Sequence, residues 1–192
     1  MDLKGKKIIL ASGSPRRREL LTSLGIEFQV DTKNNFKEEF KSETPHEEVP
    51  ALMSAGKSHG FHRPLEDDEI LITSDTMVLC GTDIMGKPSG RDDAYRMLRE
   101  LSGRKHKVIT AITIRDNQKE ITESDVAEVN FKELTDEEIW WYIDNCKPFD
   151  KAGAYGIQEW IGYIGITGIT GSYFTIMGFP TQLVWQLLQQ FI

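Results

Sequence analysis

The sequence predicts a three-layer α/β/α fold, in which helices cover a mixed, twisted central sheet and a cleft separates two lobes. Two patterns predict this class: short apolar strands alternate with amphipathic helices, and one long hairpin signature interrupts the alternation. The 192 residues, 39% of them apolar and 28% charged, suffice to bury a core. Because neither a repeat nor a linker divides the chain, we expect one domain over residues 1–192.

The first half of the chain is expected to hold, in order, a strand at 8–10, a helix closed near residue 25, a strand at 27–30, a charged mobile loop at 31–44 and a helix at 45–58. Ser14 can cap the first helix, and Pro15 can open it because the first turn leaves an N–H unused. Gly25 is suited to close it. Pro50 and Gly56 weaken the pattern of the second helix.

The second half is expected to hold, in order, strands at 69–73 and 77–80, a helix at 91–101, strands at 107–115 and 121–131, a helix capped by Thr135, a glycine-rich, β-prone stretch at 153–173 and a closing helix at 180–191. Apolar residues recur at helical spacing in 91–101. β-Branched residues alternate on both sides of an Asp116-Asn117 turn, which is typical of a hairpin.

Composition excludes several classes of protein. A net charge of −7 argues against general nucleic-acid binding, which needs clustered lysine and arginine. Cys80 and Cys146 make no disulfide framework, and the four histidines show no metal-ligand spacing. The apolar run at 8–11 is too short for a signal peptide or a membrane span, so we expect a cytoplasmic protein.

A polar turn between the first strand and the first helix is suited to hold an anion. The hydroxyls of Ser12 and Ser14 and the helix N-terminus converge there, and Arg16 and Arg17 can offer forked donors to a phosphate. The alternative is an ordinary polar turn with solvated arginines. Neither the phosphate-binding loop G-x-x-x-x-G-K-[ST] nor the dinucleotide motif G-x-G-x-x-G is present at this turn.

Two further polar positions lie near strand ends. Asp75 follows an apolar strand and is either a metal ligand or general base, or a turn residue. Lys87 lies between Gly86 and Pro88, where it offers a compact charge to a phosphate or is simply an exposed turn lysine.

The stretch 150–158 combines glycines that permit close backbone approach with Gln158, whose amide can both donate and accept. Such an amide suits the edge of a base; the alternative is a glycine-rich connection between strands. Glu38 and Lys57 flank the charged loop, and their ordinary interpretation is surface placement.

Taken together, these clusters resemble the Maf (septum formation inhibitor) family of nucleoside triphosphate pyrophosphatases. The motifs that match, in order, are Ser12-Gly13-Ser14-Pro15-Arg16-Arg17, Ser74-Asp75-Thr76, Gly86-Lys87-Pro88, Leu101-Ser102-Gly103, Asp150-Lys151-Ala152-Gly153-Ala154-Tyr155-Gly156-Ile157-Gln158, and Gly171-Ser172-Tyr173 through Gly178-Phe179-Pro180. Each motif is weak alone, but their joint order over nearly the whole chain is specific.

The resemblance implies hydrolysis of a nucleoside triphosphate to the monophosphate and pyrophosphate with a divalent cation, Mg²⁺ or Mn²⁺. It assigns the proton acceptor to Asp75, a metal to Asp75 with Glu38, and catalytic charges to Lys57 and Lys87. The substrate-binding residues that it implies are Ser12, Ser14, Arg16, Arg17, Thr76, Lys151 and Gln158. It also implies a homodimer. The net charge and the short apolar run, rather than the resemblance, lead us to expect neither nucleic acid nor a membrane as partner.

The family's subgroups differ at the positions of Arg16, Thr76 and Gln158, and these three residues resemble the group acting on dTTP and UTP. A neutral amide complements the N3–H and carbonyl of uracil or thymine, and its rotation would allow weaker CTP hydrolysis. Modified pyrimidine nucleotides are possible house-cleaning targets of such an enzyme.

The chain departs from the family pattern in two places. Gly56-Lys57-Ser58, preceded by Ala55, stands where Glu-Lys-Ala preceded by Arg is usual, and Lys37-Glu38 replaces Asp-Glu. The lost charges are expected to weaken metal or phosphate binding. They leave open an alternative function, a nucleotide-binding regulator of cell division with weak or no catalysis.

Overall fold

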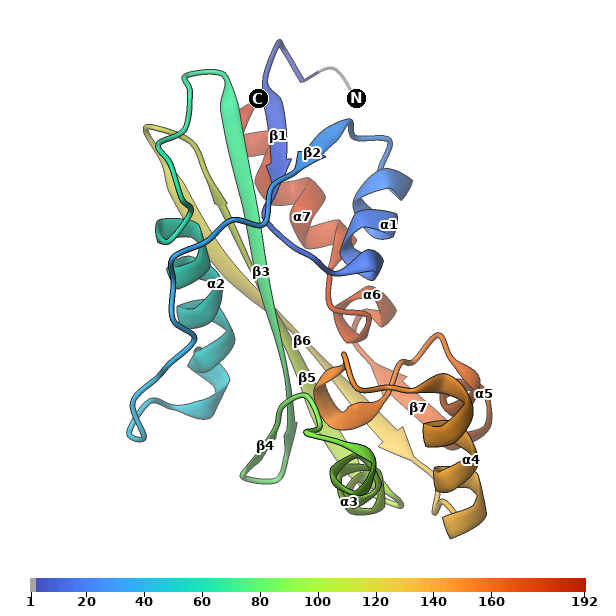
Figure 1. Ribbon diagram of the computed structural model, residues 1–192. Helices are drawn as coiled ribbons and strands as arrows, with labels where there is room; N and C mark the ends of the chain where they lie inside the picture. The colour runs from blue at the N-terminus through green and yellow to red at the C-terminus, as the bar shows by residue number, and fades with distance from the viewer. Residues whose placement is uncertain (1–2) are drawn as a thin grey trace. The chain divides into compact units, whose positions relative to one another are not determined.

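The computed structural model describes residues 3–192 and has an α/β fold, as predicted (Figure 1). Its strands form a seven-stranded sheet in the order β2-β1-β3-β5-β6-β7, with β4 paired to β3. The strands are β1 (Lys7–Leu10), β2 (Phe28–Val30), β3 (Glu69–Cys80), β4 (Asp83–Met85), β5 (Lys105–Arg115), β6 (Glu120–Phe131) and β7 (Ile166–Thr170). The sheet is mixed, because β1 pairs parallel with β2 and β3 whereas β4 and β7 pair antiparallel with β3 and β6.

Helices flank this sheet. The α-helices are α1 (Pro15–Ser23), α2 (Val49–His59), α3 (Arg91–Leu101), α4 (Asp136–Cys146), α5 (Trp160–Gly165), α6 (Tyr173–Ile176) and α7 (Thr181–Leu188). Short 3₁₀ turns are η1 (His46–Glu48), η2 (Ala152–Ala154) and η3 (Gln189–Phe191). Within residues 3–192, none of the helices has the length and apolar character needed to cross a membrane.

The described chain divides into two compact units. The first holds the described residues up to Asp75, together with Thr110–Asp125 and Gly178–Ile192, and the second is Thr76–Ile109 and Val126–Met177. Strands β3, β5 and β6 begin in one unit and continue in the other. The predicted cleft between two lobes stays a prediction.

In the first unit, α2 lies on one side of the strands and α1 and α7 lie on the other (Figure 1). Strand alternation decides which side chains meet α2. Leu71 packs with Ile9 and Phe61, and Thr73 donates a hydrogen bond to the Ser54 carbonyl on α2, 2.8 Å away. Asp75 is the next residue of this series, so the strand presents its carboxylate toward α2.

The second unit has its own apolar core. Met97, Leu98 and Leu101 of α3 are buried with Tyr142 and Ile143 of α4. The capping box predicted at Thr135 is present: Thr135 Oγ1 accepts from the Glu138 N–H while the Glu138 carboxylate accepts from the Thr135 N–H. Helix α3 has the predicted bounds, 91–101.

Two expectations about elements are wrong. Asp75 does not follow a strand, because β3 runs unbroken from Glu69 to Cys80 with Asp75 in its interior. The stretch 153–173 is not uniformly β-prone, since α5 precedes the short strand β7. In both places the local composition was ambiguous and tertiary packing selected the conformation.

The helix predicted at 45–58 is η1 followed by α2. Pro50 occupies the first turn of α2, where proline removes no helical hydrogen bond. The segment at 31–44 forms no helix or named strand, as expected of a loop, and its mobility stays a prediction. Residues 34 and 35 of this loop are hydrogen-bonded to the C-terminal end of α2. The Asn35 N–H donates to the Gly60 carbonyl at 2.8 Å, and Asn34 Nδ2 donates to the Lys57 carbonyl at 2.6 Å.

Candidate active site

The turn between β1 and α1 is closed by Ser12. Its buried hydroxyl accepts hydrogen bonds from the Ser14 N–H and from Arg17 Nη1, both at 3.3 Å. Pro15 opens α1 and Ser14 takes its N-cap position, both as predicted, but the Ser14 side chain makes no cap hydrogen bond. The N–H groups in the first turn of α1 therefore donate no hydrogen bond to the Ser14 hydroxyl, so they can donate to an anion.

Arg17 ties this turn to two other segments of the first unit. Its Nε donates to the Gly178 carbonyl at 2.9 Å and its Nη1 donates to the Ser74 carbonyl at 2.8 Å. Desolvation lowers the pKa of Arg17 to about 10, which still leaves it protonated at neutral pH. Arg16, in the same turn, is partly exposed.

Three charged side chains meet beside α2. Lys57 Nζ lies 2.6 Å from Asp75 Oδ1 and 3.0 Å from Glu38 Oε1. The side chains of Lys57 and Asp75 are only 20% and 18% exposed, whereas that of Glu38 is 64% exposed. The lysine thus joins a carboxylate of β3 to one of the segment before α2, and the structure brings together three of the predicted site residues.

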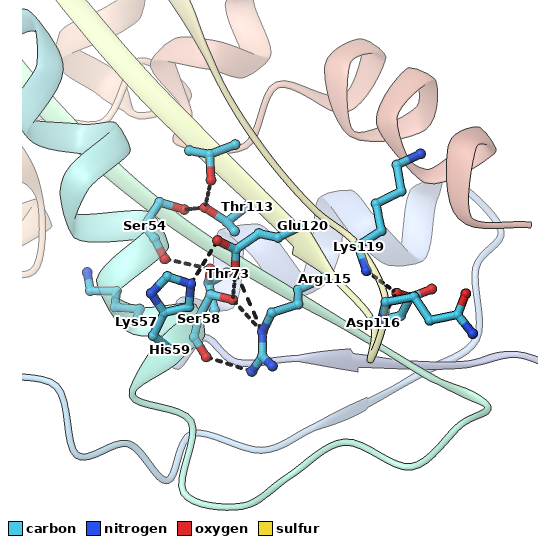
Figure 2. Close-up of polar contacts among 12 residues, drawn as sticks. Ser54, Lys57, Ser58, His59, Thr73, Thr113, Arg115, Asp116, Lys119 and Glu120 are labelled. Atoms are coloured by element: carbon cyan, nitrogen blue, oxygen red, sulfur yellow. Dashed lines mark hydrogen bonds and ion pairs between the residues drawn. The ribbon is translucent and has the colours of Figure 1, made fainter.

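A polar network holds the end of α2 that carries Lys57 (Figure 2). Arg115 donates from Nη2 to the Ser58 carbonyl at 2.9 Å and from Nε to Ser58 Oγ at 3.0 Å. The Ser58 hydroxyl in turn donates to Glu120 at 3.0 Å. A cation on the last carbonyls of a helix is electrostatically favourable, so Arg115 fixes α2 to β5 and β6.

The carboxylates of Asp75 and Glu38 also suit a divalent cation. Both oxygens already converge on one positive group, the Lys57 ammonium. Mg²⁺ and Mn²⁺ prefer oxygen ligands, and Mg²⁺ is commonly held by one or two carboxylates plus phosphate oxygens and water. Within residues 3–192 no group of three or more His, Cys, Asp or Glu is placed to hold a metal, so phosphate and water would supply the remaining ligands.

Another charged cluster lies in the second unit around Lys151, which is 9% exposed at its side chain. Its Nζ lies 2.8 Å from Asp150 Oδ1 and 3.0 Å from Glu159 Oε1. Tyr142 donates its hydroxyl proton to Glu159 and accepts from the Gly156 N–H at 2.9 Å. Burial and the Glu159 carboxylate raise the pKa of Tyr142, so its phenol stays a donor.

Sequence reasoning missed Glu159 and Tyr142. Glu159, which follows Gln158, and Tyr142, in the helix expected after Thr135, belonged to none of the motifs that were singled out. The signal that existed was Gly156, because a Cβ there would lie 2.9 Å from Glu159 Cδ and 3.1 Å from Gln158 Nε2. A glycine so closely surrounded marks a position where side chains crowd the backbone.

Gln158 has an unused acceptor. Its Oε1 is buried and, among residues 3–192, has no hydrogen-bond partner. A buried acceptor without a donor is unfavourable unless a ligand supplies one. Lys87 is exposed, and the carbonyl of the residue before it, Gly86, accepts a hydrogen bond from the Gly153 N–H at 3.0 Å. Thr76 is partly exposed on β3.

The predicted site residues therefore fall into two sets. The first unit contains Ser12, Ser14, Arg16, Arg17, Glu38, Lys57 and Asp75, and the second contains Thr76, Lys87, Lys151 and Gln158. Asp75 and Thr76 are neighbours in β3, and the boundary between the units falls at the bond that joins them.

These features define an α/β protein whose carboxylates, lysines and helix N-terminus suit a phosphate-bearing ligand. The family model described as Maf-like protein matches residues 7–191, and the chain belongs to this family.

Relatives with assigned names match over nearly their whole length. A protein of Phocaeicola vulgatus named dTTP/UTP pyrophosphatase is 46% identical over 98% of both chains. One of the same name from Parabacteroides distasonis is 45% identical over 99% of this chain and 98% of its own, and one from Porphyromonas gingivalis is 41% identical over 99% and 96%.

A HAM1 protein from Coxiella burnetii has a similar fold, with a TM-score of 0.50 and 13% identity, covering 96% of this chain and 99% of its own. This likeness shows the fold alone.

Proposed function

We propose that this protein is a nucleoside triphosphate pyrophosphatase that hydrolyses dTTP and UTP, and CTP more slowly, to the monophosphate and pyrophosphate. Full-length relatives of 41–46% identity with the name dTTP/UTP pyrophosphatase support the substrate class. The observation that carries the proposal is the cluster of Asp75, Lys57 and Glu38, which places a carboxylate beside a strong cation at 2.6 Å.

In the proposed reaction, water attacks the α-phosphorus and Asp75 accepts its proton. The bond from the α-phosphorus to the bridging oxygen breaks, and pyrophosphate leaves with that oxygen and its electron pair. Negative charge grows on the phosphate oxygens, and Lys57, Lys87, Lys151 and Arg17 are proposed to offset it. The hydroxyls of Ser12 and Ser14 are proposed to bind phosphate oxygens at the start of α1.

A divalent cation, Mg²⁺ or Mn²⁺, is proposed to bind Asp75 and Glu38. The convergence of both carboxylates on the Lys57 ammonium supports this assignment. When bound, such an ion neutralises phosphate charge and polarises the reacting phosphoryl group.

The base is proposed to be selected by Arg16, Thr76 and Gln158. The buried Oε1 of Gln158, to which no residue of the described range 3–192 donates, supports this role, because the N3–H of uracil or thymine is a donor of the required kind. Rotation of the amide would allow it to donate to N3 of cytosine instead, which is the reason for expecting slower CTP hydrolysis.

The proposal is tested by pyrophosphate release with Mg²⁺ or Mn²⁺ from dTTP, UTP, CTP, dGTP, ATP and 7-methyl-GTP. Preference for dTTP and UTP supports it. Nucleotide binding without pyrophosphate release would instead support a regulator of cell division. Modified pyrimidine nucleotides belong in the same panel as candidate house-cleaning substrates.

We also propose a cytoplasmic homodimer that does not bind nucleic acid. Sedimentation of the protein alone and with duplex DNA tests the dimer and the lack of nucleic-acid binding.

A further inference from the structure

Two glycines, one in the last turn of α2 and one directly after it, make room for one aromatic side chain. Gly56 and Gly60 are four residues apart, so they share one face of the helix end. A Cβ at Gly56 would lie 2.2 Å from Phe36 Cζ, and a Cβ at Gly60 would lie 2.6 Å from Phe36 Cβ. Real Cβ atoms essentially never approach this closely, so Phe36 occupies its place because both positions lack a side chain.

Hydrogen bonds hold the same segment on the same helix. The Asn35 N–H donates to the Gly60 carbonyl at 2.8 Å, and Asn34 Nδ2 donates to the Lys57 carbonyl at 2.6 Å. The Phe36 N–H donates to Asn34 Oδ1 at 2.8 Å, which fixes the bend between the two anchors. The chain at 34–36 is therefore bound to α2 by its backbone, an amide and a ring.

Glu38 follows this anchor by two residues. Its carboxylate lies 3.0 Å from Lys57 Nζ, although 64% of its side chain is exposed. An ion pair with one partner so exposed is stabilised little by itself, because solvent screens it and the side chain loses rotational freedom. The place of Glu38 must therefore depend on the segment that carries it.

We propose that Phe36, seated on Gly56 and Gly60, is a positioning residue that presents Glu38 to Lys57 and Asp75. The inference rests on the proposed function in assigning Glu38 to the metal. In this assignment Phe36 acts through Glu38. A carboxylate held in place needs less ordering when the cation binds, so loss of the ring weakens cation binding.

The test is a double-mutant cycle of Phe36→Ala and Glu38→Gln. Mn²⁺ binding is measured by electron paramagnetic resonance in the presence of the α,β-imido analogue of dTTP, alongside the Mn²⁺ dependence of dTTP hydrolysis. We expect Phe36→Ala and Glu38→Gln each to weaken Mn²⁺ binding about tenfold, and the double variant to bind no more weakly than Glu38→Gln alone. Losses that multiply in the double variant overturn the proposal, because Phe36 would then act independently of Glu38.

Gly56→Ala provides a steric check. In the wild-type background its methyl group displaces the ring, so Mn²⁺ binding weakens as in Phe36→Ala. In the Phe36→Ala background the methyl group has no ring to displace and has no further effect. An equal loss in both backgrounds overturns the proposal. Phe40→Ala is the matched control, because Phe40 lies in the same segment, is 44% exposed and should leave Mn²⁺ binding unchanged.

Hydrogen exchange of the nucleotide-free protein separates the two proposals. Phe36→Ala should speed exchange at the amides of Asn35 and residue 36, whose hydrogen bonds anchor the segment. If Phe36→Ala changes neither exchange nor Mn²⁺ binding while the wild-type protein turns over dTTP normally, the positioning role is overturned and the proposed function is not. A wild-type protein that releases no pyrophosphate overturns the proposed function, while faster exchange in the variant still supports the docking of Phe36.

Discussion

At the scale of single residues, two lysines each lie within 3.0 Å of two carboxylates: Lys57 beside Asp75 and Glu38, and Lys151 beside Asp150 and Glu159. Both lysine side chains are largely removed from water, so solvent screens their charges less than on an open surface. An entering polyphosphate would compete with these carboxylates for each lysine, whereas Gln158 offers an acceptor that no described residue uses.

Replacing the amide that carries this acceptor with a carboxylate should change base preference. Gln158→Glu keeps an oxygen but loses the NH₂ donor and places a negative charge near the carbonyl oxygens of uracil. We expect UTP turnover to fall by about 100-fold or more, and CTP turnover to fall less because cytosine offers an amino donor. The measurement is kcat/KM for both nucleotides. An unchanged ratio between them would remove Gln158 from base recognition.

His106 should make stability depend on pH. It is 2% exposed, its Nε2 lies 2.7 Å from the Tyr155 hydroxyl, and burial lowers its pKa from 6.5 to about 4. Between these pH values the unfolded chain binds the proton and the folded chain does not. Stability is therefore full above pH 6.5 and falls by roughly 3 kcal/mol as the pH drops toward 4.

Urea unfolding over this pH range, compared for wild type and His106→Phe, checks this contribution. The variant should be less stable at neutral pH, because it loses the Tyr155 contact, but its stability should fall less on acidification. His46→Phe, on the partly exposed turn η1, is the control and should keep the wild-type slope. The same slope in His106→Phe would contradict the assignment.

At the scale of elements, α2 is the part of the fold on which the site most depends. It carries Lys57, receives the segment at 34–36, and is tied to β5 and β6 by Arg115 through Ser58. Two of its departures from the family pattern have local structural roles, since Gly56 accommodates Phe36 and the Ser58 hydroxyl bonds with Arg115 and Glu120.

Ser58→Ala should destabilise the protein by about 1–3 kcal/mol, because it removes a buried hydroxyl and leaves the partly buried Arg115 and Glu120 side chains without it. His59→Ala is the matched control one residue away. His59 also contacts Glu120, at 2.8 Å, but its side chain is 65% exposed, so we expect a loss below about 1 kcal/mol. Urea unfolding of both variants checks the difference, and equal losses would contradict the role given to the Ser58 hydroxyl.

Periodicity predicted the elements that have a strong pattern of their own. Helix α3 has the expected bounds because its apolar residues recur at helical spacing and Ser102-Gly103 follows. Helix α5 was missed because a six-residue segment of glycine, aromatic and β-branched residues depends on its surroundings for its conformation. The break in the strand that was expected before Asp75 is wrong. Successive side chains of a strand point to opposite faces of the sheet, so a strand can continue through polar residues.

The site was predictable only in part. Asp75, Lys57 and Glu38 were assigned together through the family resemblance, and the structure brings them together. Nothing in local sequence placed Phe36, whose position depends on glycines 20 and more residues later. Glu159 and Tyr142 were missed for the same reason, since their contacts with Lys151 and Gly156 arise only in the folded chain.

At the scale of the whole molecule, the two compact units share three strands. Strands β3, β5 and β6 cross the boundary between the units without interruption. If one unit unfolded, these three strands would lose their pairing in that unit while the same strands stayed folded in the other. The units are therefore expected to unfold together.

Tryptophan fluorescence can follow the units separately. Trp185 lies on α7 in the first unit, and Trp140, Trp141 and Trp160 lie in the second. Two variants are needed: one that keeps only Trp185, and Trp185→Phe. In each variant we expect the urea midpoint measured by tryptophan fluorescence to coincide with the midpoint measured by far-ultraviolet circular dichroism. Separate fluorescence and dichroism midpoints within either variant would show that the units unfold independently.

The most direct test of the central claim is dTTP hydrolysis in ¹⁸O-labelled water with Mg²⁺. Attack of water on the α-phosphorus, with Asp75 accepting the proton, predicts pyrophosphate without label and a monophosphate that carries one ¹⁸O. Asp75→Asn should slow this reaction by about 100-fold or more while still folding. Release of orthophosphate, label in the pyrophosphate, or wild-type turnover in Asp75→Asn would contradict the account.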